Sequence, residues 1–151
     1  MSDPALTPDE THIWRSVLRL SDLLRFRVAA EMREVSDLSR TDHSVLLHLA
    51  EVDGGRMVQQ HLVESMYWSK SRMSHQLARM EGRGLVERTP DPQSRQMIVT
   101  LTAKGYEVLD AVASVHATAV RRHLFEQATA DELTALVQLS QRISGRGHGQ
   151  G

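Results

Sequence analysis

The chain has 151 residues, of which 40% are hydrophobic and 25% charged, and its formal net charge is −1. These values fit a globular domain with short appendages and exclude a largely disordered chain. The absence of cysteine excludes disulfides and a thiol-based redox sensor. The first ten residues are polar and acidic, unlike a signal peptide, and no apolar run approaches the roughly 18 residues of a membrane span. We therefore expect a soluble, cytoplasmic protein with no membrane partner.

The expected elements begin with a long helix, because Thr7 and Glu10 form a capping box around Pro8 and apolar residues then recur every three or four positions. Ser39 begins a second helix, which ends at the Gly54-Gly55 pair. A short helix and a turn follow. These elements are expected, in chain order, at residues 8–35, 39–52, 58–65 and 66–68.

The second half of the chain begins with a helix that Ser69 can cap and that Gly82 or Gly84 ends. Two short strands flank a turn-rich segment, and Thr102 and Thr129 then cap two further helices. These elements are expected at residues 69–81, 85–89, 97–101, 103–125 and 129–143. The sequence therefore predicts a mainly α protein with a small sheet, a disordered N-terminus at 1–6 and a flexible glycine-rich tail at 145–151.

Positive charge is concentrated in residues 68–104, which carry seven Lys or Arg and three Asp or Glu. That segment has a net charge of +4, so the rest of the chain carries −5. A basic stripe on an otherwise acidic protein indicates a polyanionic partner that has grooves on its surface. A solvated surface of mixed charge has the same pattern, and the charge alone leaves both interpretations open.

The helix expected at 69–81 has two distinct faces. Met73, Leu77 and Met80 lie four and three residues apart and define a buried face. The outward groups are hydrogen-bond donors suited to base edges and phosphates, since arginine binds O6 and N7 of guanine together and glutamine binds adenine. Ser69 and Lys70 stand at the helix start, where a phosphate can be held. The outward residues are Ser71, Arg72, His75 and Arg79, with Gln76 on the flank. An ordinary polar surface helix is the alternative.

The segment between the two expected strands contains Arg95 at its turn-rich tip. A hairpin that projects an arginine suits the minor groove, where a narrow width strengthens the negative potential. A solvated arginine on an exposed hairpin is the alternative interpretation.

The segment from Ser69 to Gly105 resembles the MarR (multiple antibiotic resistance regulator) family of winged helix-turn-helix transcriptional regulators. The residues that carry the resemblance are Ser71-Arg72-Met73-Ser74-His75, Leu77 through Glu81, Arg83-Gly84-Leu85-Val86, and Leu101-Thr102 with Gly105. The resemblance extends more loosely over residues 8–144, and 116–125 resembles the corresponding helix of actinobacterial members. It implies a fold that is mainly α, with a two- to three-stranded β-wing.

The resemblance also implies a regulator, expected to be a repressor, that binds a pseudo-palindromic site on double-stranded DNA. It implies that the DNA-binding residues of the recognition helix are Ser69, Lys70, Ser71, Arg72, Ser74, His75, Gln76 and Arg79. It assigns the wing contacts to Gln93, Ser94 and Arg95. Family members often carry an aspartate two positions before this arginine, whereas this chain has Gln93 there. Either Arg95 is less fixed, or Asp91 takes over that role.

The terminal helices are long and apolar on one face, and the central unit is too small to cover them, which favours a homodimer. Residues 7–144 are therefore expected to form one domain. Its dimerisation helices lie at 7–35 and 103–144, and its winged helix-turn-helix lobe lies at 39–102.

The resemblance implies a small aromatic or phenolic effector between these parts, with Trp14, His43, Leu47 and His116 as candidate pocket residues. Core or dimer-seam positions are the alternative for Trp14 and Leu47. The eight histidines lack the helical zinc spacing, so no metal site and no cofactor are expected. The sequence contains no nucleophile motif of the kind that would indicate an enzyme. A histidine/carboxylate metal-dependent enzyme or a zinc-responsive regulator is the alternative function.

Overall fold

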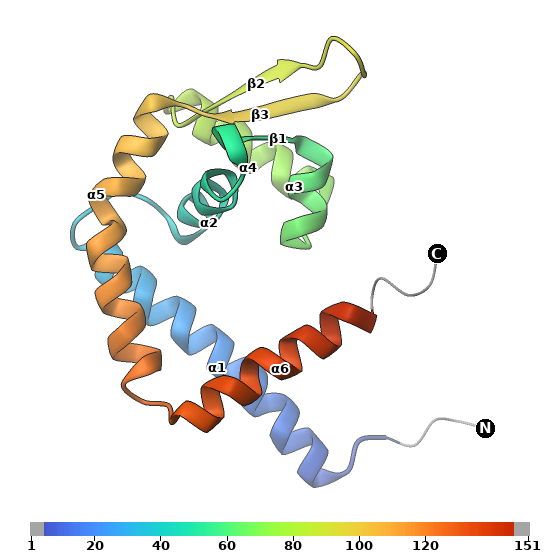
Figure 1. The fold of residues 1–151 in the computed structure, drawn as a ribbon, viewed down its shortest axis with the longest axis vertical. Helices are drawn as coiled ribbons and strands as arrows, with labels where there is room; N and C mark the ends of the chain where they lie inside the picture. The colour runs from blue at the N-terminus through green and yellow to red at the C-terminus, as the bar shows by residue number, and fades with distance from the viewer. Residues whose placement is uncertain (1–4, 147–151) are drawn as a thin grey trace. The chain divides into compact units, whose positions relative to one another are not determined.

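The computed structural model describes residues 5–146 (Figure 1). The chain forms two compact units. The lobe unit comprises Met32–Val115, and the terminal-helix unit comprises the residues up to Glu31 together with those from His116 onward. Residues 1–4 of the N-terminus predicted to be disordered (1–6) and residues 147–151 of the predicted tail (145–151) lie outside the described residues. Helix α6 continues to Arg146, three residues beyond the predicted end.

Within its described residues, the lobe unit contains three complete α-helices, three strands and the first part of α5 (Ala103–Val120). Helix α2 runs over Arg40–Ala50, α3 over Gln59–Met66 and α4 over Lys70–Gly82. The expected starts of α2 and α4 are confirmed, because Ser39 forms a complete capping box with Asp42 and the Ser69 side chain accepts a hydrogen bond from the Arg72 backbone. A short 3-10 turn, Asp53–Gly55, follows α2. Helix α4 therefore begins and ends close to where the sequence predicts.

The sheet has three antiparallel strands in the order β1-β3-β2. Strand β1 is Arg56–Val58, β2 is Val86–Pro90 and β3 is Met97–Leu101. Strands β2 and β3 form the predicted hairpin. Strand β1 is the third strand of the wing, which was expected to have two or three strands. Helices α2, α3 and α4 gather beside the sheet (Figure 1).

The core of the lobe unit lies where these helices meet the sheet. Its side chains come from every one of these helices and from strands β2 and β3, and each is at most 1% exposed. They include Leu46 and Leu49 of α2, Leu62 of α3, Met73 and Leu77 of α4, and Val86 and Val99 of the sheet. Burial on this scale fixes the rotation of α4 about its axis, since a different rotation would expose its methionines.

Helix α5, Ala103–Val120, begins in the lobe unit, where its first turn packs closely against the sheet. Thr102 caps it by accepting a hydrogen bond from the Gly105 backbone N–H at 3.0 Å. A Cβ atom on Gly105 would lie 2.4 Å from the Leu85 carbonyl oxygen and 2.7 Å from a methyl carbon of Leu101. Only glycine permits this approach without a shift of the backbone.

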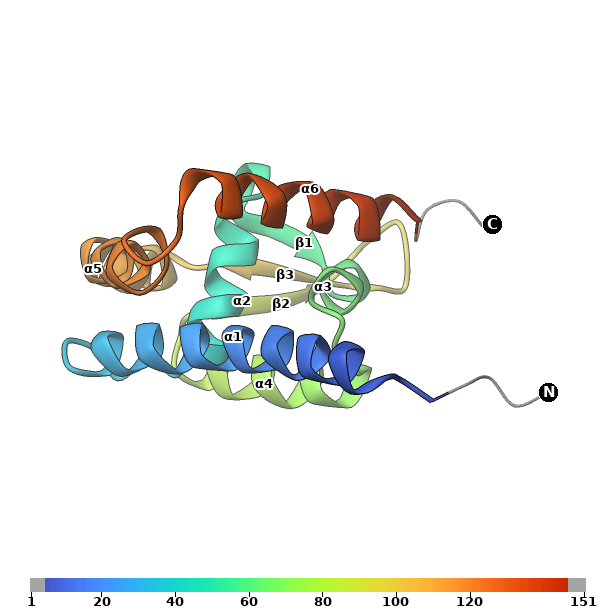
Figure 2. The same cartoon turned by 90° about the horizontal axis from the view of Figure 1, so that it is seen from below.

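The terminal-helix unit contains most of α1, Pro8–Arg33, the end of α5 and α6, Ala130–Arg146. The predicted helix to residue 125 ends instead in a π-helical turn, Arg121–Phe125. Glu31 connects α1 to this turn, because its carboxylate accepts hydrogen bonds from Arg122 at 3.0 Å and from His123 at 2.6 Å. In Figure 2, α1 and α6 both run across the view as two separate helices. Along the described chain, no helix is both apolar enough and long enough to pass through a bilayer.

The close approach at Gly105 gives a first prediction. The Gly105→Ala variant should be about 1–3 kcal/mol less stable than the parent, because the added methyl group overlaps backbone and core atoms. Urea unfolding measures this difference. The matched control is Gly82→Ala, whose Cβ would meet nothing within 4 Å and which should leave the stability unchanged or slightly higher. Equal stabilities for the two variants would contradict this packing.

Candidate nucleic-acid interface

Helix α4 presents one buried and one open face, as its sequence predicts. Met73, Leu77 and Met80 are fully buried. The predicted outward residues Ser71, Arg72, His75 and Arg79 are exposed, and Ser74 is half-buried at the edge. The open face therefore carries two guanidinium groups, an imidazole and hydroxyl groups, which can all donate hydrogen bonds.

The start of α4 is open to solvent. Helix α3 ends at Met66, and its C-cap residue Tyr67 adopts the left-handed conformation with φ 54°. Ser69 and Lys70 are both exposed at the first turn of α4. The unpaired backbone N–H groups and the positive end of the helix dipole lie here, so this turn attracts anions.

Trp68, in the turn before α4, supports Arg72. The guanidinium carbon of Arg72 lies 3.8 Å from the centroid of the Trp68 ring, which is a cation–π contact. The contact limits the positions of an otherwise long and mobile side chain. This role of Trp68 was not predicted, although its position four residues before Arg72 is visible in the sequence.

A buried polar network joins α4 to the start of α2. The Asp42 side chain is 7% exposed. Its Oδ1 accepts a hydrogen bond from Nε2 of Gln76 at 2.6 Å, and its Oδ2 accepts one from Nη1 of Arg83 at 2.7 Å. The Ser39 backbone N–H also donates to Oδ2 at 2.9 Å. Burial raises the pKa of Asp42, but the hydrogen bonds from Ser39 and Arg83 outweigh it and hold the pKa below its ordinary value.

The expectation that Gln76 lies on the flank of the outward face is wrong. Gln76 is 3% exposed, and both ends of its amide are occupied, because Oε1 accepts a hydrogen bond from Nη2 of Arg79 at 2.7 Å. Helical periodicity put Gln76 on the flank, and the Asp42 carboxylate draws it inward. Asp42 stands near the start of the helix that Ser39 begins, but its contact with Gln76 spans 34 positions and leaves no local pattern.

The hairpin tip between β2 and β3 is ordered by Asp91. Its Oδ1 accepts a hydrogen bond from the Gln93 backbone N–H at 3.0 Å, and its Oδ2 accepts one from the Ser94 hydroxyl at 2.8 Å. These bonds lower the pKa of Asp91, the one from Gln93 most strongly. Arg95 is exposed, and within the described chain its side chain forms no hydrogen bond or ion pair. Asp91 thus shapes the loop and does not hold the Arg95 guanidinium.

The basic stripe is smaller than the sequence suggests, because internal partners take up some of its charges. Arg83 pairs with Asp42 and with the exposed Asp37, and Arg88 pairs with Glu81. Lys104 donates to the Arg83 carbonyl oxygen at 2.9 Å. Within the described residues, the exposed basic residues of the stripe that form no ion pair are Lys70, Arg72 and Arg79 of α4, Arg95 of the wing and Lys104 at the start of α5.

The candidate effector residues are divided between the two units. Trp14 and His116 belong to the terminal-helix unit, and His43 and Leu47 lie one turn apart on α2 in the lobe unit. Trp14 is 55% exposed and His43 is 7% exposed. Burial lowers the pKa of His116. An effector site built from these four residues stays a prediction.

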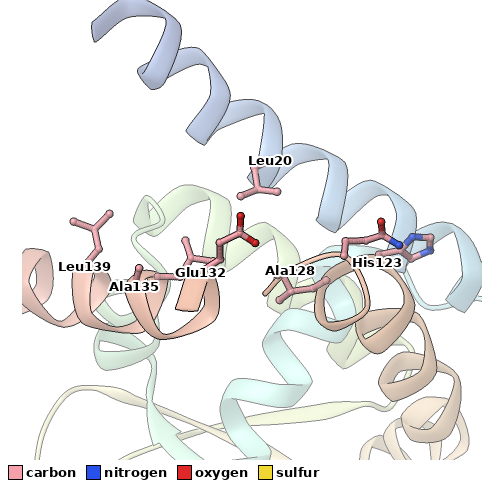
Figure 3. Close-up of a pocket in the computed structure, with 9 residues that line it drawn as sticks. Leu20, His123, Ala128, Glu132, Ala135 and Leu139 are labelled. Atoms are coloured by element: carbon pink, nitrogen blue, oxygen red, sulfur yellow. The ribbon is translucent and has the colours of Figure 1, made fainter. Parts of the chain in front are cut away.

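A different pocket, of about 460 Å³, lies inside the terminal-helix unit. Leu20 of α1 faces Glu132, Ala135 and Leu139 of α6, and His123 lies at the π-helical turn (Figure 3). Its lining is mostly apolar. Among the described residues, no cluster of three histidine, aspartate or glutamate side chains could hold a metal ion.

Comparisons with known proteins agree with this geometry. Residues 36–96 match the model of the MarR family. The transcriptional regulator HosA of Escherichia coli O157:H7 is 30% identical over 126 residues, which cover 83% of this chain and 91% of HosA. AbsC, a MarR family transcriptional regulator from Streptomyces coelicolor, is 32% identical with a TM-score of 0.85 over 98% of this chain and all of AbsC. Sco3205 from the same organism, solved in complex with DNA, is 29% identical with a TM-score of 0.86 over 99% of this chain and 94% of its own.

The fold and the open helix face define a winged helix-turn-helix DNA-binding protein. The chain belongs to the MarR family of transcriptional regulators. Its relatives are named as regulators of transcription rather than as enzymes.

The network around Asp42 gives a second prediction. Asp42→Asn should lower the free energy of unfolding by about 2–4 kcal/mol at neutral pH, because it leaves buried donors poorly paired. The folded-state pKa lies below the unfolded value of about 3.9, so this stability is fully present above that pH and is lost as the pH falls through the folded pKa. The difference from the parent should therefore shrink in urea unfolding between about pH 7 and pH 2.5.

Asp37→Asn is the matched control, since Asp37 also pairs with Arg83 but its side chain is 89% exposed. It should cost less than about 1 kcal/mol. If the difference in the free energy of unfolding between the parent and Asp42→Asn stays constant across this pH range, the charge of Asp42 contributes nothing to stability.

Proposed function

We propose that the chain is a homodimeric repressor that binds a pseudo-palindromic operator through two α4 helices in successive major grooves, about 34 Å apart. The observation that carries the proposal is the open face of α4. Met73, Leu77 and Met80 form its buried face, and Arg72, His75 and Arg79 lie exposed on the other side of the helix. Arg72 and Arg79 are suited to guanine. Ser69, Lys70, Ser71 and Ser74 are proposed to hold phosphates.

The wing adds a proposed minor-groove contact through Arg95, with Gln93 and Ser94 beside it. The support is physical, since Asp91 keeps the loop ordered while the Arg95 guanidinium stays available. A narrow minor groove attracts such a side chain without reading a particular base pair. Phosphate contacts would supply much of the affinity and make it depend on salt.

The proposed homodimer is supported by the terminal helices. Large apolar side chains on α1 and α6 are exposed although they lie on amphipathic helices. They include Ile13, Val17 and Phe26 of α1, and Val137 and Ile143 of α6, each more than half exposed. A patch of this kind marks an interaction surface, and a second copy supplies the same kind of helices to cover it.

Release by a small aromatic or phenolic effector is the regulatory step that fits this architecture. A ligand that prefers one spacing of the two lobes would shift the population toward or away from the DNA-binding spacing. Trp14, His43, Leu47 and His116 stay the candidate residues. The likeness of residues 116–125 to actinobacterial members also stays a prediction, because the relatives include E. coli HosA as well as S. coelicolor AbsC.

The recognition role is tested by single alanine variants of Arg72, His75 and Arg79. Each should weaken binding to a duplex selected from a random pool by about 1–3 kcal/mol and relax the preference at one base pair. Arg95→Ala should instead lose most affinity on sites with A·T-rich flanks. Gel shifts at two salt concentrations measure both effects.

Arg33→Ala is the control, because Arg33 is an exposed arginine at the end of α1, outside the recognition helix and the wing. It should bind like the parent. Parent-like binding by all three α4 variants would refute the assignment of the recognition helix. An equal loss of affinity for Arg95→Ala on sites with every kind of flanking sequence would contradict a minor-groove contact by Arg95.

The dimer is tested by light scattering at micromolar concentration, which should report twice the chain mass of 17.0 kDa. Val137→Glu should shift the protein toward the monomer, because it buries a charge in the proposed seam. Gln138→Glu adds the same charge at the next, already polar and exposed position of α6, and should remain dimeric. A monomeric parent, or identical behaviour of the two variants, would contradict a dimer built on this face.

A further inference from the structure

The buried amide of Gln76 links a buried carboxylate to an exposed guanidinium, and we infer that Gln76 positions Arg79 for DNA instead of reading a base itself. The inference rests on the proposed function and deepens it. Two contacts carry it: Gln76 donates to Asp42 at 2.6 Å, and Arg79 donates to Gln76 at 2.7 Å. Gln76 is 3% exposed, so its amide is almost out of reach of a base edge.

The chemistry of the three groups fixes the direction of both hydrogen bonds. The Asp42 carboxylate is ionised and can only accept, so the NH₂ group of Gln76 must face it. The carbonyl oxygen of Gln76 then points away from Asp42, and this oxygen can only accept. Arg79 carries donors and no acceptor, so it is the side chain of α4 that completes the chain of bonds.

We call the hydrogen-bonded side chains of Asp42, Gln76 and Arg79 the relay. The relay restricts the position of the Arg79 side chain and leaves most of its hydrogen-bond donors available. One N–H of its guanidinium is bound to Gln76, and the remaining donors are free to contact a guanine or a phosphate. A side chain that is already held in place loses less conformational entropy when it binds. Asp42 is itself held by Ser39 and Arg83, so the start of α2 determines where Arg79 lies.

A double-mutant cycle on DNA affinity tests the relay. Arg79→Ala should weaken binding to the selected duplex about ten- to hundredfold. Gln76→Met keeps the length and apolar packing of the side chain but removes its hydrogen bonds, and should weaken binding about five- to tenfold. In the Arg79→Ala background the same Gln76→Met change should alter the affinity by less than about twofold.

The control combines Gln76→Met with Arg95→Ala, and these two losses should add because the wing does not share the relay. Equal losses from Gln76→Met with and without Arg79 would overturn the inference and indicate direct contact or a general distortion. If Arg79→Ala binds like the parent while Arg72→Ala and His75→Ala do not, the relay fails and the proposed function stands. If the parent binds no duplex, the proposed function itself fails.

Circular dichroism and thermal unfolding establish that each variant is folded. If Gln76→Met does not fold, NMR of the parent alone decides the question. The relay predicts slow rotation of the Arg79 guanidinium, with separate signals for its Nη groups, and slow exchange of the Gln76 side-chain amide protons. A freely rotating Arg79 guanidinium in the parent would overturn the inference.

Discussion

Burial of the methionine and leucine face of α4 is the constraint on which the rest of the structure depends. Met73, Leu77 and Met80 are fully buried between α4 and its neighbours in the lobe unit. Their burial contributes about 1.5–3 kcal/mol for each side chain and permits only one rotation of the helix. That rotation puts Arg72, His75 and Arg79 at the surface. The capacity to contact DNA is thus a consequence of how the core packs.

Local patterns in the sequence predicted most of the lobe unit correctly. Ser39 and Ser69 cap their helices as expected, and the hairpin lies within one residue of its predicted strands. These features depend on residues a few positions apart, so a single sequence reveals them. The inward direction of the Gln76 side chain and the ion pair of Arg83 both depend on Asp42, which lies 34 positions from Gln76 and 41 positions from Arg83. Contacts of that range leave no periodic trace, which is why the inward position of Gln76 and the internal ion pairs within the basic stripe were not predicted.

The terminal helices show a different limit of sequence-based prediction. Their amphipathic periodicity was clear, and the helices form, yet much of the apolar stripe of α1 is exposed, with Ile13 at 62% and Phe26 at 63%. Periodicity predicts that a face will be buried but does not identify the surface that covers it. The end of α5 was also not predictable, because the π-helical turn depends on Glu31, some 90 positions earlier, which binds Arg122 and His123.

The central claim is that the open face of α4 is the surface that contacts DNA. Hydrogen exchange, followed by mass spectrometry, compares the free protein with its complex on a duplex selected from a random pool. We expect protection on binding to be concentrated in residues 69–79, with a second, smaller effect at 91–96. Protection that spares α4 and falls on other elements of the lobe unit would contradict it.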